Sequence, residues 1–337
     1  MKARFYKQSF QFKRPSGTSR GVLTEKHSWM IELWNENQPN IIGVGECSII
    51  PGLSPDFLHD TQYEAEISAL CNDLSRDLTD FPSIQFGLET ALLDLKNGGK
   101  RIIFDNDFAK GKQQLPINGL IWMGDEDFMR EQIEEKIATG FSTIKLKIGA
   151  IDFDTEIKIL ESIRKRFDSN QIVLRVDANG AFSTEEVISK LEILSQFGIH
   201  SIEQPIKAGQ WTEMAQLCAC TPIAIALDEE LIGVNQLSKK TQLLETIKPQ
   251  FIILKPSLHG GIMGCKEWIS LAEQRNIPWW MTSALESNIG LDAICQFAAE
   301  YQNDLPQGLG TGSLYVENTP TTLTVENGMI FRLNHSL

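Results

Sequence analysis

Hydrophobic and polar residues alternate along the first fifty residues of the chain, and the pattern then changes to helical spacing. The alternating segments are separated by turn residues and predict antiparallel β-strands at 2–12, 28–34 and 41–46. Pro51-Gly-Leu-Ser54 interrupts the pattern, and residues 60–98 then repeat apolar positions at the spacing of an α-helix. The first third of the chain is therefore predicted to fold as an α+β unit.

A second pattern begins near residue 115, where short apolar segments alternate with amphipathic helical ones. Each apolar segment is a predicted β-strand, and they centre on 117–120, 144–147, 173–177, 201–203, 223–227, 251–255, 280–283 and 308–310. Strand, loop and helix repeated in this way predict eight parallel strands closed into a barrel. An open doubly wound sheet is disfavoured, because residues 119–124 do not resemble the glycine-rich nucleotide loop that follows its first strand.

The two patterns divide the chain into three predicted parts. Residues 1–112 form a capping domain, residues 113–313 form the barrel, and residues 314–337 return to strand-like alternation and rejoin the capping domain. The predicted fold class is α/β: a modified TIM barrel of (β/α)7β form, with an α+β capping domain formed by the N-terminal region and the C-terminal tail.

Composition narrows the class of protein. The net charge of -13 argues against a nucleic-acid or anionic-membrane surface, which needs clustered lysine and arginine. The first residues lack the apolar segment of a signal peptide, and no run approaches the roughly 20 apolar residues of a membrane span. The six cysteines have no disulfide-framework or zinc-site spacing and are interpreted as reduced thiols: Cys47, Cys71, Cys218, Cys220, Cys265 and Cys295. A cytoplasmic protein is predicted, and the sequence does not determine its oligomeric state.

Two lysines, Lys145 and Lys147, lie in the predicted strand at 144–147. Alternate residues of a strand share a face, so both ammonium groups point the same way. Unpaired charges are very costly to bury, and this apolar strand is expected to be buried. We therefore expect anionic groups opposite the two lysines.

Three carboxylates occupy the ends of successive predicted strands: Asp177, Glu203 and Asp228. Functional groups of a parallel barrel gather at the carboxyl ends of its strands, and neighbouring strands are about 4.8 Å apart, so these side chains should converge. Three oxygen ligands that leave positions open for water and substrate suit Mg²⁺, with Mn²⁺ also possible. Each acid alone is explained as well by an ion pair, and strand parity allows Glu230 in place of Asp228.

A catalytic interpretation of the lysines follows. A neighbouring ammonium group and a divalent cation both disfavour the charged form of lysine, so Lys147 is expected to act as a base. Lys255, at the end of the sixth predicted strand, faces the same centre unless it is an exposed strand-end lysine. Such a set suits removal of a proton α to a carboxylate. Arg175 and Asn179 support this site, although Arg175 is equally explained by an ion pair with Asp177.

These motifs occur in a characteristic order: Lys-x-Lys at 145–147, Asp-Ala-Asn at 177–179, Glu-Gln-Pro at 203–205, Asp-Glu at 228–229 and then Lys255. Together they resemble the enolase superfamily, and within it the muconate lactonizing enzyme subgroup. The resemblance covers nearly the whole chain and implies a capping domain, a barrel and a C-terminal return. It also implies a Mg²⁺-dependent enzyme with a lysine base.

Further segments are similar to the dehydratases of menaquinone biosynthesis in that subgroup: Gly45-Glu-Cys-Ser-Ile-Ile-Pro-Gly-Leu-Ser54, Arg175-Val-Asp-Ala-Asn179, Ser283-Ala-Leu-Glu-Ser-Asn-Ile-Gly290 and Gly308-Leu-Gly-Thr-Gly312. The resemblance implies a carbon–oxygen lyase that converts 2-succinyl-6-hydroxy-2,4-cyclohexadiene-1-carboxylate, a small anionic substrate, to 2-succinylbenzoate. Lys147 would then take the α-proton and return it to the leaving hydroxide, Lys145 would tune it, and Lys255 would stabilise the enolate.

The resemblance also implies substrate contacts from Ser283, Leu285, Glu286, Gly310 and Thr311. Residues 15–21 are either an ordinary hairpin connection or a loop that closes over the barrel mouth and brings Arg20 to a substrate carboxylate.

Three alternatives stay open. A dipeptide epimerase or an N-acylamino acid racemase of the same superfamily would use lysines on opposite faces of one carbon. The segment Gly310-Thr-Gly-Ser313 lacks the Asp-x-Asp pair with which such epimerases bind a substrate ammonium group, but N-acyl substrates have no such group. Muconate cycloisomerisation is a weaker possibility. A non-catalytic barrel protein is disfavoured, because none of the expected ligands or bases is missing.

Overall fold

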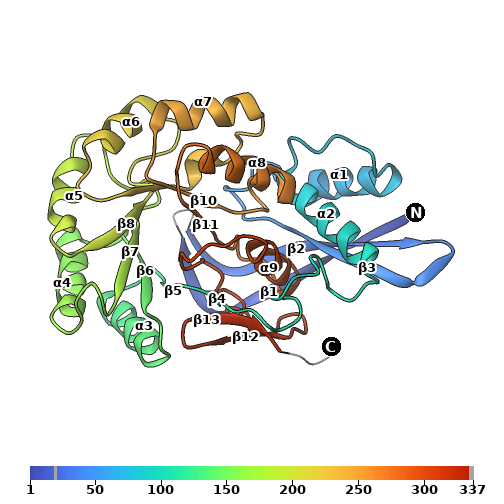
Figure 1. Cartoon of the computed structure of the whole chain (residues 1–337), viewed down its shortest axis with the longest axis horizontal. Helices are drawn as coiled ribbons and strands as arrows, with labels where there is room; N and C mark the ends of the chain where they lie inside the picture. The colour runs from blue at the N-terminus through green and yellow to red at the C-terminus, as the bar shows by residue number, and fades with distance from the viewer. Residues whose placement is uncertain (19–20, 334–337) are drawn as a thin grey trace.

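The computed structural model describes residues 1–18 and 21–333, in which an N-terminal antiparallel sheet lies against a parallel barrel (Figure 1). The sheet contains β1 (Lys2–Thr18), β2 (Gly21–Asn35) and β3 (Gln38–Ser48), in that order. Helices α1 (Asp60–Asn72) and α2 (Pro82–Lys96) pack on this sheet. The predicted α+β unit is confirmed, because the alternating segments are strands and the segment with helical spacing forms two helices.

Strand β2 buries both of its faces. Trp29, Ile31 and Leu33 point to one face and pack with residues of α1 and α2. Met30 points to the opposite face and packs in a cluster that contains residues of the barrel loops, such as Leu285. The capping sheet is therefore a layer between its own helices and the barrel.

Seven parallel strands form the barrel sheet, in the order β11-β10-β9-β8-β7-β6-β5. The strands are β5 (Gly119–Ile121), β6 (Thr143–Lys147), β7 (Val173–Asp177), β8 (Ile199–Glu203), β9 (Ile225–Leu227), β10 (Phe251–Leu254) and β11 (Trp279–Met281). The helices between and after them are α3 (Glu126–Ala138), α4 (Phe153–Arg164), α5 (Val187–Ser195), α6 (Trp211–Cys220), α7 (Leu237–Ile247), α8 (Gly261–Glu273) and α9 (Asn288–Ala298), with a short 3₁₀ helix, η1 (Glu229–Leu231). The predicted alternation of strand and helix is confirmed.

Residues 307 and 308 connect the first and last strands of this sheet. Gln307 forms a parallel bridge to Ile117, and Gly308 forms one to Thr282. A Cβ atom at Gly308 would lie 2.2 Å from Thr282 Oγ1, so only glycine permits this approach. The strand predicted at 308–310 is therefore reduced to isolated bridges that close the barrel.

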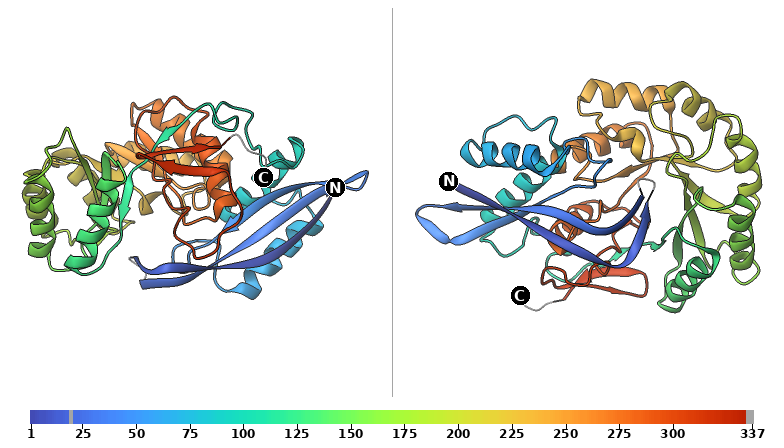
Figure 2. Two further views of the ribbon diagram at one scale, coloured as in Figure 1. Left: turned by 90° about the horizontal axis from the view of Figure 1, so that it is seen from below. Right: turned by 180° about the vertical axis from the view of Figure 1, so that it is seen from behind.

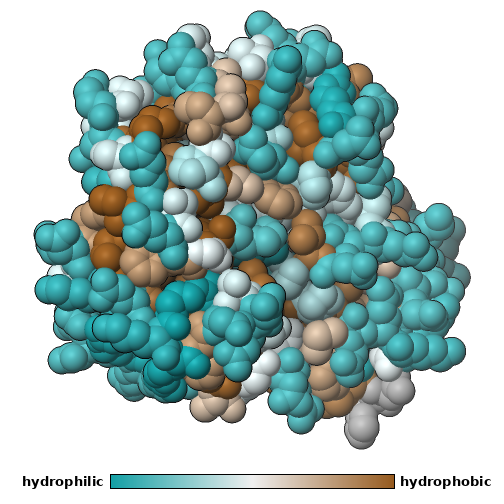
Figure 3. Space-filling model, turned by 60° about the vertical axis from the view of Figure 1, so that its left-hand side comes forward, coloured by the Kyte–Doolittle hydropathy of each residue, from teal (hydrophilic) through white to brown (hydrophobic). Residues whose placement is uncertain are grey.

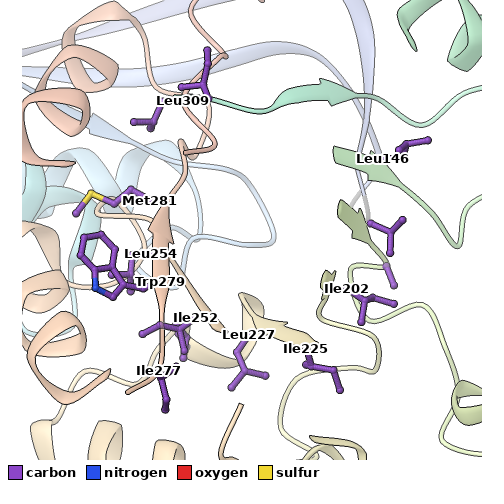
Figure 4. Close-up of a cluster of buried hydrophobic side chains, with 14 of the residues drawn as sticks. Leu146, Ile202, Ile225, Leu227, Ile252, Leu254, Ile277, Trp279, Met281 and Leu309 are labelled. Atoms are coloured by element: carbon purple, nitrogen blue, oxygen red, sulfur yellow. The ribbon is translucent and has the colours of Figure 1, made fainter. Parts of the chain in front are cut away.

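Branched and aromatic side chains fill the layer between the barrel strands and the surrounding helices, on the strand face opposite to that of Lys145, Asp177 and Ala226. Figure 4 shows part of this layer, with side chains from the strands and from the segments beside them: Leu146, Ile202, Ile225, Leu227, Ile252, Leu254, Ile277, Trp279, Met281 and Leu309. The inner face of the strands instead holds a small apolar cluster of Ala226, Ile253 and Trp280, together with polar side chains such as Lys145 and Asp177.

The C-terminal residues contact both units. Tyr315 forms an antiparallel bridge with Phe12 of β1, so this segment lies along the capping sheet. Strands β12 (Leu323–Glu326) and β13 (Met329–Arg332) form a hairpin that pairs with β4 (Leu115–Pro116), just before the barrel. Figure 2 shows this hairpin beside the barrel and the long first strands. The predicted domain limits at 112 and 313 stay a prediction.

Hydrophilic side chains cover most of the face seen in Figure 3, and the hydrophobic residues between them form separate small patches. No helix in the described part of the chain is both long and apolar enough to cross a membrane. The six cysteines are free thiols.

Candidate active site

Parallel register brings the strand-end residues together at one end of the barrel. β6 pairs with β7 so that Lys147 lies opposite Asp177, and β7 pairs with β8 so that Asp177 lies opposite Glu203. Asp228 and Lys255 each follow directly after a strand, β9 and β10 respectively. Because the carboxyl ends of parallel strands share one rim of a barrel, side chains far apart in the sequence meet here.

Ion pairs join the two lysines of β6 to the carboxylates of β7 and β8. Lys145 Nζ lies 2.9 Å from Asp177 Oδ2 and also bonds to Glu203. Lys147 Nζ lies 3.0 Å from the same Asp177 oxygen and donates a hydrogen bond of 2.7 Å to Asn179 Oδ1. Asp177 and Glu203 are buried, so the anionic groups expected opposite the lysines are present.

Asp228, rather than Glu230, joins this cluster. The carboxylate of Asp228 is buried and pairs with Lys255 Nζ. Glu230 points toward the loop after β8, where its oxygens accept hydrogen bonds from Gly209 N at 2.7 Å and Gln204 Nε2 at 3.1 Å. The turn of η1 separates the two acids, which strand parity alone had left as alternatives.

Burial and mutual charge shift the pKa values in opposite directions within the cluster. Burial and the neighbouring Asp177 carboxylate raise the pKa of Glu203, although Lys145 opposes this. Burial acts to raise the pKa of Asp177 as well, but the ammonium groups of Lys145 and Lys147 outweigh it and hold that pKa below its ordinary value. Burial acts to lower the pKa of Lys145 and Lys255, yet the carboxylates raise both. The sequence predicts a lowered lysine pKa when a divalent cation is bound at the site, and this stays a prediction.

A cavity of about 100 Å³ opens over the cluster. Its walls come from the barrel strands, from the loops after β11 and near residue 310, and from the capping segment after β3: Ile50, Leu53, Asn118, Leu120, Trp122, Lys145, Lys147, Asp177, Asn179, Glu203, Glu229, Lys255, Thr282, Ser283, Ala284, Leu285, Gly308, Gly310 and Thr311. A second cavity of about 350 Å³ shares Asn118, Leu120, Trp122, Gly310 and Thr311 with it. The acidic cluster is thus the floor of a pocket with an adjoining compartment.

Known proteins resemble this chain over most of its length. A family model described as "Enolase C-terminal domain-like" matches residues 128–333. The o-succinylbenzoate synthase of Desulfotalea psychrophila is 46% identical, over 98% of this chain and 98% of that protein. The chain belongs to the o-succinylbenzoate synthase family of the enolase superfamily.

Solved structures agree with this membership. The crystal structure of MenC from Desulfotalea psychrophila has a TM-score of 0.87 at 42% identity and covers 98% of this chain and 99% of its own. A dipeptide epimerase from Cytophaga hutchinsonii, complexed with Mg and D-Ala-L-Val, has a TM-score of 0.79 at 20% identity and covers 97% and 92%. The second likeness shows a shared fold. The resemblance drawn from the ordered motifs is confirmed.

The acidic cluster of this family member fits a divalent cation by its donor chemistry. Asp177, Glu203 and Asp228 supply the hard oxygens that Mg²⁺ prefers. Glu203 Oε1 and Asp228 Oδ1 are buried without a hydrogen-bond partner, a costly arrangement that a cation would relieve. The lysine ammonium groups lie between the acids. As they stand, no group of three Asp, Glu, His or Cys side chains within residues 1–18 and 21–333 is close enough together to hold a metal ion. Cation binding would therefore be accompanied by a shift of these side chains.

Arg175, predicted to support the site, lies below it. Its guanidinium stacks 4.0 Å from the centre of the Trp280 ring and donates a hydrogen bond of 2.7 Å to Pro306 O. It does not line the cavity, and no ion pair joins it to Asp177. Arg175 is two residues before Asp177 on β7, so it shares the face of Asp177 but lies one layer deeper in the barrel.

Glu286 also lies outside the cavity, whereas Ser283, Leu285, Gly310 and Thr311 line it. The Glu286 carboxylate accepts hydrogen bonds from Ser257 Oγ at 2.6 Å and Ser283 Oγ at 2.7 Å. A tight turn folds Glu286 back onto the hydroxyl three residues before it, so the acid holds the wall of the pocket instead of forming it. Arg20 lies outside the described residues.

The cavity also contains residues that sequence reasoning did not select. Glu229 accepts a hydrogen bond of 2.8 Å from Asn179 Nδ2, and its Oε2 atom is buried without a partner. Asn118 directly precedes the first barrel strand, and a polar side chain next to an apolar strand could have indicated a site residue. Ile50 and Leu53 reach the cavity from the capping unit, and nothing local in the sequence indicates that they do.

Proposed function

We propose that this chain is a hydro-lyase that converts 2-succinyl-6-hydroxy-2,4-cyclohexadiene-1-carboxylate to 2-succinylbenzoate in menaquinone biosynthesis. The observation that carries the proposal is identity of 46% over 98% of both chains to an o-succinylbenzoate synthase. The buried set of two strand lysines, three carboxylates and a third lysine opposite them supports it chemically.

The reaction removes a proton from the carbon next to the substrate carboxylate and hydroxide from the neighbouring carbon. Asp177, Glu203 and Asp228 would hold Mg²⁺, or Mn²⁺, which when bound neutralises the charge that builds up on the substrate carboxylate. Lys147 takes the proton as a base, and the electron pair left on carbon expels hydroxide from the ring. The protonated amine of Lys147 then donates its proton to the departing hydroxide on the same face, so that one water leaves and the ring becomes aromatic.

Other residues hold Lys147 and the developing charge. Asn179 accepts a hydrogen bond from Lys147 Nζ and donates one to Glu229, which orients the amine. The ammonium group of Lys145 compensates the negative charges of the Asp177 and Glu203 carboxylates. Lys255 directly follows β10, which lies four strands from β6 in the sheet, and it stabilises the enolate as a cation over the opposite face.

The second candidate is racemisation of an N-acylamino acid, favoured by one observation: lysines stand on both sides of the cluster. A dipeptide epimerase is less well supported, because the cavity wall at 310–311 presents no acid for a substrate ammonium group. We further propose a cytoplasmic protein that acts on a small anionic substrate without a nucleic-acid or membrane partner, in keeping with its net charge of -13.

The test is an assay of the purified protein with the cyclohexadiene substrate and Mg²⁺, followed by the ultraviolet absorbance of the aromatic product. N-succinyl amino acids are assayed in parallel for loss of optical rotation. We expect dehydration that EDTA abolishes and Mg²⁺ restores. Racemisation without dehydration would overturn the proposed substrate but keep the superfamily. The absence of dehydration, of racemisation and of α-proton exchange in D₂O would overturn the proposed activity as a whole.

A further inference from the structure

The turn after β11 forms one wall of the pocket in a strained conformation. Ser283, Ala284 and Leu285 all line the cavity, and Leu285 has φ of 62°. A residue with a Cβ atom adopts this left-handed region at an energetic cost, so the surroundings must hold it there. Strain of this kind at a ligand pocket points to a function for the groups that maintain it.

Glu46 of β3 holds the far end of this turn, where α9 begins. Its carboxylate is fully buried and accepts hydrogen bonds from Ser287 N at 2.9 Å, Ser287 Oγ at 2.6 Å and Gly290 N at 2.9 Å. Ser28 Oγ of β2 donates a fourth bond at 2.7 Å. A carboxylate that caps a helix N-terminus with all four sites used is firmly placed, and this one comes from the capping sheet.

Tyr315 holds the strained residue itself. Its hydroxyl donates a hydrogen bond of 2.6 Å to the carbonyl oxygen of Leu285. The Tyr315 ring lies between Phe10 and Phe12 of β1, at centroid distances of 5.1 and 5.0 Å. The capping sheet therefore fixes both the carbonyl of Leu285 and the start of the following helix.

Lys26 of β2 supports the same region from a buried position. Its ammonium bonds to Ser48 Oγ, and Ser48 Oγ donates to Ala284 O at 3.5 Å. Burial lowers the pKa of Lys26, although the Glu46 and Glu286 carboxylates oppose this shift. The lysine thus interacts electrostatically with two buried acids that both anchor the turn.

We infer that Glu46 and Tyr315 are positioning residues, through which the capping sheet sets the substrate-binding geometry of the turn at 283–287. Neither residue lines the cavity, so each acts through the turn. The inference rests on the assignment of this pocket as the substrate site of the proposed reaction. The capping unit thus shapes the pocket wall through these two residues, and this effect is separate from direct contact of its loops with substrate.

The test compares two carboxylates of the capping unit that both cap barrel helices. Glu46→Gln removes the charge at α9. Glu89→Gln is the matched control, because Glu89 of α2 accepts hydrogen bonds from Ile262 N and Met263 N at the start of α8, and residues 256–260 before that helix do not line the cavity. Tyr315→Phe removes only a hydroxyl and serves as the test if Glu46→Gln does not fold.

We expect KM for the cyclohexadiene substrate, and Kd for 2-succinylbenzoate, to rise about tenfold or more in Glu46→Gln and several-fold in Tyr315→Phe, with kcat within about threefold of wild type. Glu89→Gln should lower thermal stability similarly but leave KM within about twofold. Hydrogen–deuterium exchange of the backbone at 283–290 should rise in the two test variants and not in the control.

Unchanged KM and unchanged exchange at 283–290 in both test variants would overturn the inference. So would an equal rise of KM in Glu89→Gln, which would indicate a general loss of stability. The exchange measurement needs no substrate, so it decides whether the two residues hold the turn even if the wild type fails to dehydrate the proposed substrate. In that case KM is measured with the N-succinyl amino acid that the wild type turns over.

Discussion

Replacing Lys145 by methionine removes one charge from the middle of the buried cluster and keeps an unbranched side chain that is one heavy atom shorter. In the wild type this ammonium contacts Asp177 and Glu203, whose side chains are 1% and 3% exposed. Breaking a buried ion pair costs about 3–5 kcal/mol, because the remaining charge stays buried without compensation. Lys147 still compensates Asp177 in the variant, so the loss falls on Glu203 and should be near the lower value.

The loss converts to a shift in melting temperature through the entropy of unfolding. An entropy of about 2.1 cal/mol/K per residue amounts to roughly 0.7 kcal/mol/K for the 337 residues of this chain. A loss of about 3 kcal/mol therefore lowers Tm by about 4 °C. The assay is thermal unfolding followed by circular dichroism at pH 8, in EDTA and then with increasing Mg²⁺.

Added Mg²⁺ should raise the Tm of Lys145→Met more than that of the wild type, because the cation supplies the missing positive charge and binds the folded state. Lys165→Met is the matched control, since Lys165 is 77% exposed and its Nζ lies 3.8 Å from Glu161. It should change Tm by less than about 1 °C. A Tm of Lys145→Met equal to that of the wild type in EDTA would refute the buried-charge argument, and a Tm that does not respond to Mg²⁺ in either protein would refute the cation site.

Three further changes test separate parts of the structure. Lys147→Ala should lower kcat by at least about 10³-fold, because one amine serves as base and acid, while Mg²⁺ affinity measured by calorimetry stays within a few-fold; near-normal turnover contradicts the base assignment. Gly45→Ala should lower the free energy of unfolding, measured in urea, by about 1–3 kcal/mol, since a Cβ atom there would lie 1.9 Å from Gly87 O and push β3 away from α2. An unchanged urea midpoint would mean that the two elements can move apart without cost. Burial raises the pKa of Glu156 from 4.5 to about 7, so the folded state binds this proton more tightly and stability falls as pH rises through that window. Glu156→Gln should therefore lose less stability between pH 5 and pH 8 than the wild type, and parallel pH curves for the two proteins would argue against the shift.

Much of the candidate site was predictable because its signals are local. Alternation placed Lys145 and Lys147 on one face of a strand, and the repeated strand and helix pattern predicted a parallel barrel, in which strand ends share a rim. The structure brings both lysines, with Asp177 and Glu203, to that rim. Periodicity carries this information because it depends only on the spacing of neighbours along the chain.

Depth within the barrel was not predictable in the same way. Arg175 and Asp177 have the same parity on β7, yet Arg175 stacks on Trp280 in the interior while Asp177 lines the cavity. Glu286 follows a strand end as the other acids do, but its turn directs it to Ser257 and away from the cavity. Parity decides which face a side chain takes, and the packing of neighbouring strands and loops decides whether that face is open or covered.

The sequence by itself determined the fold class, the order of the elements and the identity of the polar strand ends, because each depends on residue type and spacing over a few positions. Only the tertiary structure decided which of these groups touch. Glu46 and Ser287 are separated by 241 positions in the chain and are joined by two hydrogen bonds in the folded protein. Such contacts depend on how the capping sheet packs on the barrel, a long-range arrangement that no local pattern of hydrophobic and polar residues encodes.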